Sequence, residues 1–382
     1  MKKLIICCNH SFKHCGGTER VIQQISESMN KDFGWKTFVF SQTTKNSFSH
    51  NGVNYLSINQ NADFFIDQIN KISPDYLFVY SDFFIHWITI LCKHHLIKCR
   101  KGIALVGANM MLSRIHIWNN FVSNHNFFDV ITHSDNYQDY KACVNSNIPV
   151  TVIPNGVDLK EFSQENIDFK KKYQVNSKYV ILCVANFFPG KGQEHLIKIL
   201  DKLSSDGIDF TAIFICSTVN FAPANILRES TRKQLKTKSF KWKILLDIPR
   251  EDVISAYKSS DVFVFPSQKE VAPLVILEAM AANLPWVSMP VGNVSQLEGG
   301  MIVRKYSKDL SKNQNEFFKD GLFYTEETYG EFIFYIKKIL EEKSLRNELS
   351  LKGKSQILEY YSWDKIAPKY NQIFEGNNGT SG

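Results

Sequence analysis

Short apolar runs recur along the first half of the chain and are separated by polar or helical stretches. Runs of this length, bounded by turn residues, are typical of buried strands in a parallel sheet whose connecting segments supply the helices. We therefore predict an α/β domain in this half. The runs are LIICC near residue 4, TFVF near 37, DYLFVY near 75, GIALV near 102, DVITHS near 129 and VTVIPNG near 150.

The pattern restarts after the charged segment that follows the VIPNG run. Further apolar runs predict a second sheet, so two similar doubly wound domains fit better than one large sheet. We place the domains at residues 1–160 and 161–355, with a final helical segment at 356–376. Residues 377–382 have nothing to bury and are expected to form a disordered tail. The second set of runs is KYVILCVANF near 178, FTAIFIC near 210, WKILL near 242, DVFVFPS near 261 and LPWVSMP near 284.

In each half a strand runs into a glycine-containing turn that opens an amphipathic helix. The first N–H groups of a helix lack partners within it and lie at the positive end of its dipole, so an anion is favoured there. Gly16 and Gly17 allow close approach of a ligand, and Lys191 adds a positive charge suited to phosphate. The alternative interpretation is two plain tight turns and a solvated lysine.

The stretch KEVAPLVILEAMAANLP, at 269–285, places two carboxylates in a largely apolar segment. We predict that Glu270 lies in a loop, that a helix begins at about Leu274, and that Glu278 lies in its second turn. The amides of Leu274 and Val275 then point toward a ligand phosphate. In the alternative interpretation, Glu278 is only a carboxylate stabilised by the helix dipole.

Composition limits the choice of function. The chain has 382 residues, is 44% hydrophobic and 22% charged, and carries a net charge of +7, which falls short of a nucleic-acid-binding domain. Its eight cysteines form no CxxC pair, which favours reduced thiols and a cytoplasmic location. The apolar run in MKKLIICCNHS is too short for a signal peptide. The window from Tyr76 to Cys92 is interrupted by polar residues and predicts a strand followed by a helix, not a membrane span.

A second interpretation places the protein peripherally on the inner face of a membrane. The stretch CKHHLIKCRKG is basic, and nearby aromatic residues could rest on an anionic lipid surface. The alternative is a solvated helix end above a stripe of core residues. The residues concerned are Lys93, Lys98, Arg100 and Lys101, with Phe83, Phe84 and Trp87.

Five stretches, in this order, resemble the retaining glycosyltransferases of family 4, also called group 1 glycosyltransferases, which have the GT-B fold. This resemblance implies two Rossmann-like doubly wound domains facing a central cleft. The nucleotide-sugar donor would bind mainly to the C-terminal domain and the acceptor to the N-terminal one, and the helix after Trp363 would cross back onto the first domain. The stretches are GGTERV at 16, VIPNGVDLKEF at 152, VANFFPGKGQEHLI at 184, SSDVFVFPSQKEVAPLVILEAMAANLP at 259 and YYSWDKIAPKY at 360.

The resemblance also implies roles for individual residues. Glu278 would accept hydrogen bonds from the ribose hydroxyls, and Glu270 would lie beside the transferred sugar. Lys191 would stabilise the leaving diphosphate, over which the loop of Gly16 and Gly17 would close. The remaining donor-site positions are Asp247 and Ile248 beside the base, and Val271, Ala272, Pro273, Leu274 and Val275 along sugar and diphosphate.

Three positions depart from the family pattern. Asn186 stands where many members have an arginine, so one partner for the diphosphate charge is missing. Gly107, Ala108 and Asn109 occupy the strand end that often carries a histidine; Asn109 could donate a hydrogen bond there but cannot act as an acid or base. Pro273 replaces a common glycine and removes one amide donor.

The expected function is retaining transfer of a sugar from a nucleotide-diphosphate donor, UDP favoured over GDP, to a hydroxyl of a glycan, lipid-linked or protein acceptor. The chain contains no DxD triplet, so we expect no metal ion on the diphosphate and no other cofactor. Lys191, Glu270 and Asn109 are the predicted catalytic residues. Two alternatives are a nucleotide-sugar epimerase on the same fold and a non-catalytic sugar-nucleotide-binding relative, the latter motivated by Asn186 and the missing histidine.

Overall fold

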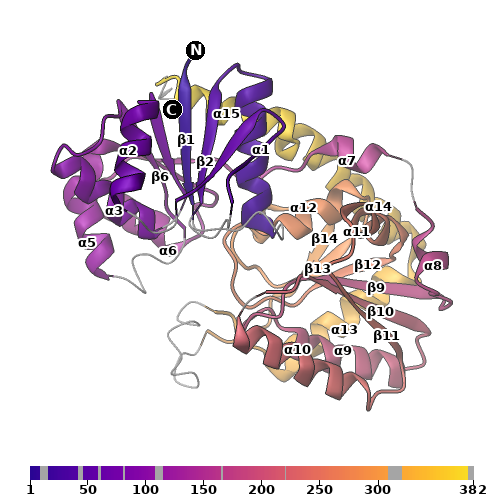
Figure 1. The fold of residues 1–382 in the computed structure, drawn as a ribbon. Coiled ribbons are helices and arrows are strands. Elements are labelled where there is room, and N and C mark those ends of the chain that lie inside the picture. Colours follow the sequence, from indigo (N-terminus) through magenta and orange to yellow (C-terminus); the bar gives the residue numbers. More distant parts are fainter. Residues whose placement is uncertain are drawn as a thin grey trace. The chain divides into compact units, whose positions relative to one another are not determined.

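The computed structural model describes residues 1–8, 16–41, 46–58, 62–80, 82–107, 115–164, 167–219, 221–308 and 321–376. The chain divides into two compact α/β units, a first unit of Met1–Asn155 with Asp364–Gly382 and a second unit of Gly156–Trp363 (Figure 1). The division after Asn155 lies in the segment where the apolar pattern restarts. The tail predicted at 377–382 lies outside the described residues.

The first unit contains an eight-stranded sheet with the order β3-β4-β2-β1-β5-β6-β7-β8, in which every pair is parallel except β3 with β4. The six strands predicted from the apolar runs are confirmed, whereas the short β3 and β4 were not predicted. β3 is exposed along its whole length, so it carries no apolar run. The strands are β1 (Lys3–Cys8), β2 (Lys36–Ser41), β3 (Phe48–His50), β4 (Val53–Ser57), β5 (Tyr76–Val79), β6 (Lys101–Leu105), β7 (Phe128–Thr132) and β8 (Val150–Val152).

The last helix of the chain belongs to the first unit. The indole Nε1 of Trp35 donates to Asn371 Oδ1 at 2.9 Å, and the Trp35 and Phe374 rings meet edge to face. Both contacts fix the end of α15 against residues that precede β2. The described helices of this unit are α1 (Gly17–Lys31), α2 (Ala62–Ile72), α3 (Asp82–Lys93), α5 (Ile115–Asn124), η1 (His125–Phe127), α6 (Gln138–Asn145) and α15 (Trp363–Phe374).

The second unit contains a six-stranded parallel sheet with the order β11-β10-β9-β12-β13-β14. β10 is buried at all seven positions, as its unbroken apolar run predicts. The five predicted strands are confirmed, and the three-residue β14 was not predicted. The strands are β9 (Tyr179–Val184), β10 (Phe210–Cys216), β11 (Lys241–Leu246), β12 (Val262–Phe265), β13 (Trp286–Ser288) and β14 (Gly300–Ile302).

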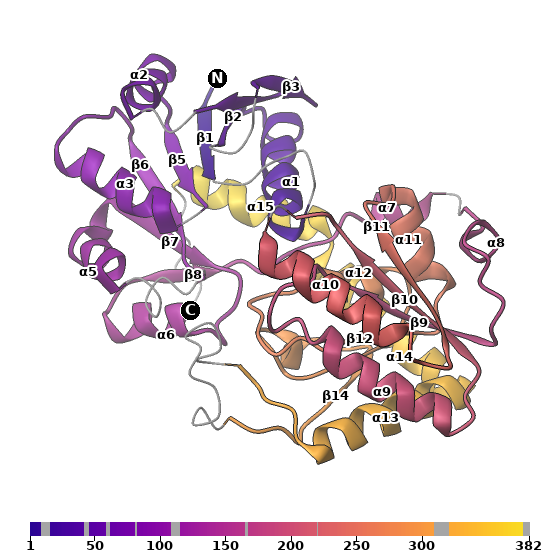
Figure 2. The same cartoon turned by 60° about the horizontal axis from the view of Figure 1, so that its bottom comes forward.

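Helices pack on this second sheet, and Figure 2 shows α9 running beside α10 and α13. The sheet order reverses between β9 and β12, which are neighbours although β10 and β11 lie between them in the chain. Ligands of open α/β sheets bind at the carboxyl ends of the strands beside such a reversal. The helices are α7 (Leu159–Ser163), α8 (Phe169–Lys172), α9 (Gln193–Ser205), α10 (Ala222–Leu235), α11 (Arg250–Ser259), α12 (Leu274–Ala281), η2 (Val294–Gln296), α13 (Glu326–Glu341), α14 (Lys343–Gln356) and η5 (Ile357–Tyr361).

Candidate functional site

Two loops meet where the second sheet reverses: the loop from β9 to α9 and the loop from β12 to α12. The backbone N–H of Gln268 donates to Gly190 O at 2.8 Å and ties the loops together. Gly192, the residue before α9, has φ of 75°, and a Cβ there would lie 2.1 Å from Pro266 O. Only glycine meets both conditions without strain, which explains the glycine of the PGKGQ turn.

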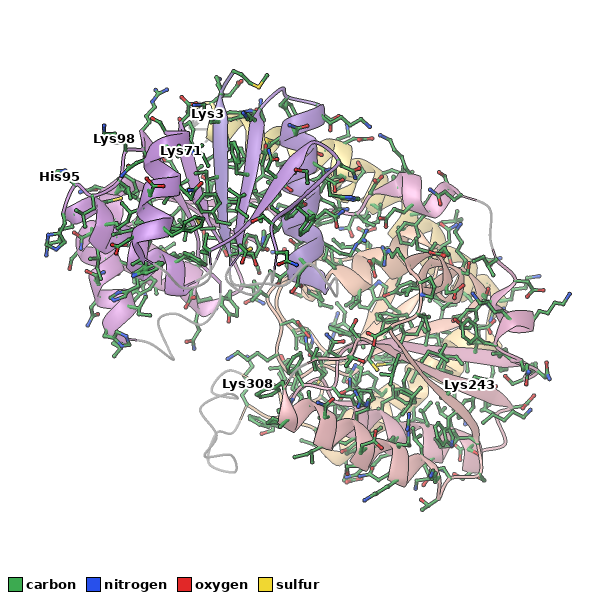
Figure 3. The ribbon with its side chains drawn as sticks, in the orientation of Figure 1. Lys3, Lys71, His95, Lys98, Lys243 and Lys308 are labelled. Atoms are coloured by element: carbon green, nitrogen blue, oxygen red, sulfur yellow. The ribbon has the colours of Figure 1, made fainter. Side chains whose placement is uncertain are left out.

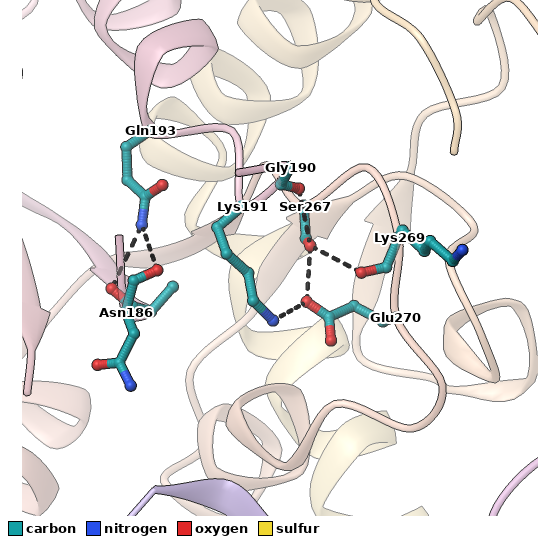
Figure 4. A network of polar contacts seen from close by, with 8 residues as sticks. Asn186, Gly190, Lys191, Gln193, Ser267, Lys269 and Glu270 are labelled. Atoms are coloured by element: carbon teal, nitrogen blue, oxygen red, sulfur yellow. Dashed lines mark hydrogen bonds and ion pairs between the residues drawn. The ribbon is translucent and has the colours of Figure 1, made fainter. Parts of the chain in front are cut away.

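Lys191 and Glu270 are brought together by these loops. Lys191 Nζ lies 2.6 Å from Glu270 Oε1, and the hydroxyl of Ser267 donates to the same oxygen at 2.6 Å (Figure 4). The side chains of Lys191 and Glu270 are 28% and 13% exposed, so the pair is partly shielded from water. Ser267 is buried and was not predicted; its only signal in the sequence is its place directly after the strand and Pro266. The structure therefore joins two predicted catalytic residues directly, and a third side chain holds the carboxylate in place.

Asn186 joins the ends of neighbouring strands. Its side-chain Oδ1 accepts from the N–H of Ser217, just after β10, at 2.8 Å. Gln193 Nε2 donates to the backbone oxygens of Ala185 and Asn186, at 3.3 and 3.2 Å (Figure 4). The asparagine that replaces the family arginine thus fixes the shape of the loop.

Asp247 has a similar function at the end of β11. Its backbone has a φ of 49°, a left-handed conformation that aspartate tolerates better than most residues. Its carboxylate accepts from the backbone N–H of Thr218 at 2.8 Å and from the Thr218 hydroxyl. Ile248, the next residue, packs against the core of the unit. The predicted base-side residues therefore lie on a loop that is tied to the end of β10.

The predicted helix after Glu270 is confirmed and begins at Leu274, with Val275 as its second residue. Pro273 precedes it with φ of −71° and supplies no N–H. The oxygen of Val271 accepts from the N–H of Asn293 at 3.0 Å, and the Cβ of any side chain at Gly292 would lie 2.2 Å from that oxygen. The backbone of Val271, Ala272 and Pro273 is thus supported by the loop after β13, which the sequence interpretation did not include.

Glu278 lies in the second turn of α12, as predicted, and is buried. Its Oε1 lies 2.7 Å from Arg250 Nη2, and the same nitrogen lies 2.8 Å from Glu161 Oε2. Burial alone would lower the pKa of Arg250, but the charges of Glu278 and Glu161 outweigh this and raise that pKa above its usual value. Arg250 and Glu161 were not predicted, because they lie far from Glu278 along the chain.

A neutral histidine lies behind the Ser267 loop. The ring of His195 stacks on Tyr324 with centroids 3.9 Å apart, and His195 Nδ1 lies 2.6 Å from the Tyr329 hydroxyl. Burial, helped by the charge of Lys198, lowers the pKa of His195 to about 4. The Tyr324 hydroxyl donates to Pro266 O at 2.9 Å, so this cluster supports the loop that carries Ser267.

The remaining predicted residues belong to the first unit. Gly16 precedes α1 in an extended conformation, and a Cβ on it would lie 2.8 Å from Glu19 Oε2; Gly17 is the first residue of the helix. Gly107, after β6, has φ of 144°. Asn109 and Ala108 lie outside the described residues.

The structure also brings together two side chains of the first unit that were not predicted. The Tyr80 hydroxyl, after β5, lies 2.9 Å from His133 Nε2, after β7, and His133 Nδ1 lies 2.9 Å from Ile153 O. Burial lowers the pKa of His133 to about 4.

The structure removes one aromatic residue from the membrane hypothesis. Phe84 is fully buried and has no ring for a lipid surface, whereas Trp87 packs against the core of the first unit and stays partly exposed. The side chain of Phe83 is outside the described set. Lys93, Lys98 and Arg100 are exposed, whereas Lys101 pairs with Asp129.

The basic stretch itself lies at the amino end of β6, opposite the strand ends where parallel sheets bind ligands. Lys71, His95 and Lys98 are labelled along that edge in Figure 3. Among the helices that the structure describes, none is long and apolar enough to cross a membrane. In the described part of the chain, no group of three or more His, Cys, Asp or Glu side chains is arranged to hold a metal ion.

Comparison with known proteins identifies the family of the chain. The sequence profile of the family described as glycosyl transferases group 1 matches residues 164–356, just over half of the 382-residue chain. The chain belongs to this family. The matched segment contains Lys191, Glu270 and Glu278, together with Ser267 and Arg250.

Relatives that are similar in sequence are named for different transferase activities. The chain is 28% identical, over 39% of its length and 32% of the other protein, to a phosphatidylinositol N-acetylglucosaminyltransferase GPI3 subunit of Saccharomyces cerevisiae. It is 24% identical, over 62% of its length and 58% of the other, to a UDP-Gal:alpha-D-GlcNAc-diphosphoundecaprenol alpha-1,3-galactosyltransferase of Escherichia coli. The chain thus spans between a third and three fifths of these relatives.

Solved structures of the family fold cover the whole chain. HepE of Anabaena, in complex with UDP-glucose, has a TM-score of 0.75 and 16% identity, covering 98% of this chain and 100% of the other. At this identity the likeness concerns the fold, and it confirms the predicted GT-B class with two parallel-sheet α/β domains.

Proposed function

We propose that the protein transfers a sugar from a UDP-sugar to an acceptor hydroxyl with retention of anomeric configuration and without a metal ion. One observation carries this proposal: the ion pair of Lys191 and Glu270, 2.6 Å long, which lies between the starts of α9 and α12. Family membership and the nucleotide sugars named for relatives support the donor class.

The charges suit cleavage of an anomeric C–O bond. As this bond breaks, positive charge builds on the sugar and negative charge builds on the diphosphate. Fixed donors aimed at the leaving oxygen atoms lower the barrier, and the first N–H groups of α9 and α12 are fixed in this way. The ammonium group of Lys191 adds a full positive charge at the same place. These groups would fulfil the role that a metal ion has elsewhere.

Donor binding would change the partner of Lys191. In the structure its ammonium group is paired with Glu270. A diphosphate carries more negative charge and would draw Lys191 away, which leaves Glu270, still held by Ser267, to accept hydrogen bonds from the sugar hydroxyls. Glu278 would accept from the two ribose hydroxyls, since a carboxylate can accept from vicinal hydroxyls at once.

The nucleotide and the acceptor are inferred from relatives. The E. coli relative and the HepE complex are both named with a uridine nucleotide, which favours UDP over GDP. Phosphatidylinositol and diphosphoundecaprenol, which appear in the names of the two relatives, are lipids. Of the three predicted acceptor classes, glycan, lipid-linked and protein, we therefore favour the lipid-linked one, reached from the cytoplasm.

The test is calorimetric titration with UDP followed by transfer assays with radiolabelled UDP-sugars, lipid-linked acceptors and excess chelator. We expect UDP binding, acceptor-dependent transfer that survives the chelator, and retained anomeric configuration in the product by NMR. A protein that binds no nucleoside diphosphate contradicts the proposal. Donor conversion without any acceptor would identify an epimerase, and tight donor binding without turnover would identify a non-catalytic relative.

A further inference from the structure

One buried guanidinium group lies between two carboxylates of the second unit. Arg250, the first residue of α11, places Nη2 at 2.7 Å from Glu278 Oε1 and at 2.8 Å from Glu161 Oε2. Its Nε donates to Glu161 Oε2 as well, at 3.1 Å. The side chains of Arg250 and Glu161 are 27% and 26% exposed, and that of Glu278 is 8% exposed.

The second carboxylate comes from the VIPNGVDLKEF stretch, to which the proposed function gives no role. Asp158 caps α7 by accepting from Lys160 N at 2.9 Å, and this places Glu161 and Phe162 one turn later. The ring of Phe162 lies 5.8 Å from the Arg250 guanidinium carbon. The stretch therefore contacts Arg250 through the carboxylate of Glu161 and the ring of Phe162.

The arrangement has a physical reason. A buried carboxylate without a partner is strongly unfavourable, and a guanidinium is the cation best suited to hold one in a fixed geometry. Two carboxylates around one guanidinium give the cluster a net charge of −1, so its capacity to accept hydrogen bonds is not exhausted. Glu161 accepts from both Nε and Nη2 of Arg250, so the guanidinium group stays in place when Glu278 binds a ligand.

We propose that Arg250, anchored by Glu161, is the positioning residue that keeps Glu278 oriented toward the ribose hydroxyls of the donor. This inference rests on the proposed function, because it assigns the supporting residues of the same donor site. Arg250 does not contact the donor in this account; it acts through Glu278. A purely structural clamp between α7, α11 and α12 is the alternative, and it would leave ribose recognition unchanged.

The experiment measures recognition of a single hydroxyl. Calorimetry gives the dissociation constants of UDP and of 2′-deoxyuridine diphosphate for the wild type and for R250Q, R250K, E161Q and E278Q. A hydrogen bond to a charged group predicts that the wild type prefers UDP by about tenfold. We expect R250Q and E278Q to lose this preference. The double variant R250Q/E278Q should lose no more of it than E278Q alone. R250K keeps the charge without the planar fork and should fall between wild type and R250Q.

Controls separate positioning from folding. K172A removes the ion pair between Lys172 and Asp252, which lies on α11 like Arg250. This variant should keep the wild-type preference for UDP over its 2′-deoxy form. If R250Q does not fold, E161Q decides, since it keeps the pair of Arg250 and Glu278 and should reduce the preference only in part. If R250Q folds and keeps the full wild-type preference for UDP, the inference is overturned. If R250Q does not fold, E161Q with the full wild-type preference overturns it.

A failure of the proposed function gives a different titration result from a failure of this inference. A wild type that binds UDP and its 2′-deoxy form equally would overturn the role of Arg250 and Glu278 in ribose binding, while donor binding itself would stand. A wild type that binds no nucleoside diphosphate would overturn both proposals.

Discussion

The two units begin with the same local pattern, a strand, a glycine turn and a helix with a glutamate in its first turn, but they differ in which charged side chain lies beside that turn. In the second unit the turn before α9 carries Lys191, and the neighbouring loop ties it in place through Gly190 and Gln268. In the first unit the carboxylate of Glu19 folds back to Gly16 at the start of α1. A similar sequence pattern therefore places an ammonium group before one helix and a carboxylate beside the glycine before the other, and the ammonium group is the one that attracts an anion.

The largest expected effect comes from removing the positive charge in the second unit. Lys191→Ala should lower kcat for sugar transfer by about 100- to 1,000-fold, because one fixed donor to the developing negative charge is lost. The measurement is single-turnover transfer at saturating donor. Lys202→Ala, in the helix α9 that follows Lys191, is the matched control, because the Lys202 side chain is 58% exposed and pairs with Asp206 at the surface. Equal rates for the two variants would remove Lys191 from the mechanism.

Acid should weaken both units through one buried histidine each. The pKa values of His133 and His195 are about 4 in the folded protein against an ordinary 6.5, so the unfolded state binds more protons between these values. Stability is therefore full above about pH 6.5 and falls as the pH drops toward 4, by at most about 3 kcal/mol for each histidine.

Hydrogen exchange, followed for each unit separately, measures this loss. His133→Gln should flatten the pH dependence of the first unit alone, and His195→Gln that of the second alone. His50→Gln, at an exposed histidine, serves as the control. A variant that keeps the wild-type pH dependence in its own unit would refute the assignment.

The sequence predicted the elements that bury long apolar runs and the residues that lie within a short motif. Lys191 was found because it lies in a glycine turn before a predicted helix, and Glu270 and Glu278 were found because they lie in one short motif. Their partners were not, since Glu161 lies 89 residues from Arg250 and proximity of that kind arises only from the sheet order. Ser267 lies 3 residues from Glu270, but serine after a strand has many ordinary uses. The strands β3 and β14 have three residues each, and β4 alternates buried and partly exposed positions, so none of them carries an unbroken apolar run.

The two glycine turns should differ in their tolerance of a side chain. Gly192→Ala forces a left-handed φ on alanine and drives its Cβ into the Pro266 carbonyl, so the second unit should lose about 1 to 3 kcal/mol of unfolding free energy. Gly16→Ala meets only the flexible end of Glu19 in an extended conformation and should lose less than about 1 kcal/mol. Urea denaturation compares the two. Equal losses would mean that the closer packing around Gly192 contributes nothing to the free energy of unfolding.

The smallest effect tests whether the first turn contacts the donor at all. The resemblance implies that Gly16 and Gly17 close over the diphosphate, where Glu19 would repel it. Glu19→Gln should then lower the KM for the donor by about two- to fivefold at low salt, the range expected for one charge at a helix start. Salt should abolish the gain, because ions screen the repulsion. Glu27→Gln, later on α1 and bonded to Gln23, is the matched control. An unchanged KM for Glu19→Gln at every salt concentration would separate this turn from the diphosphate and leave the second unit to bind it alone.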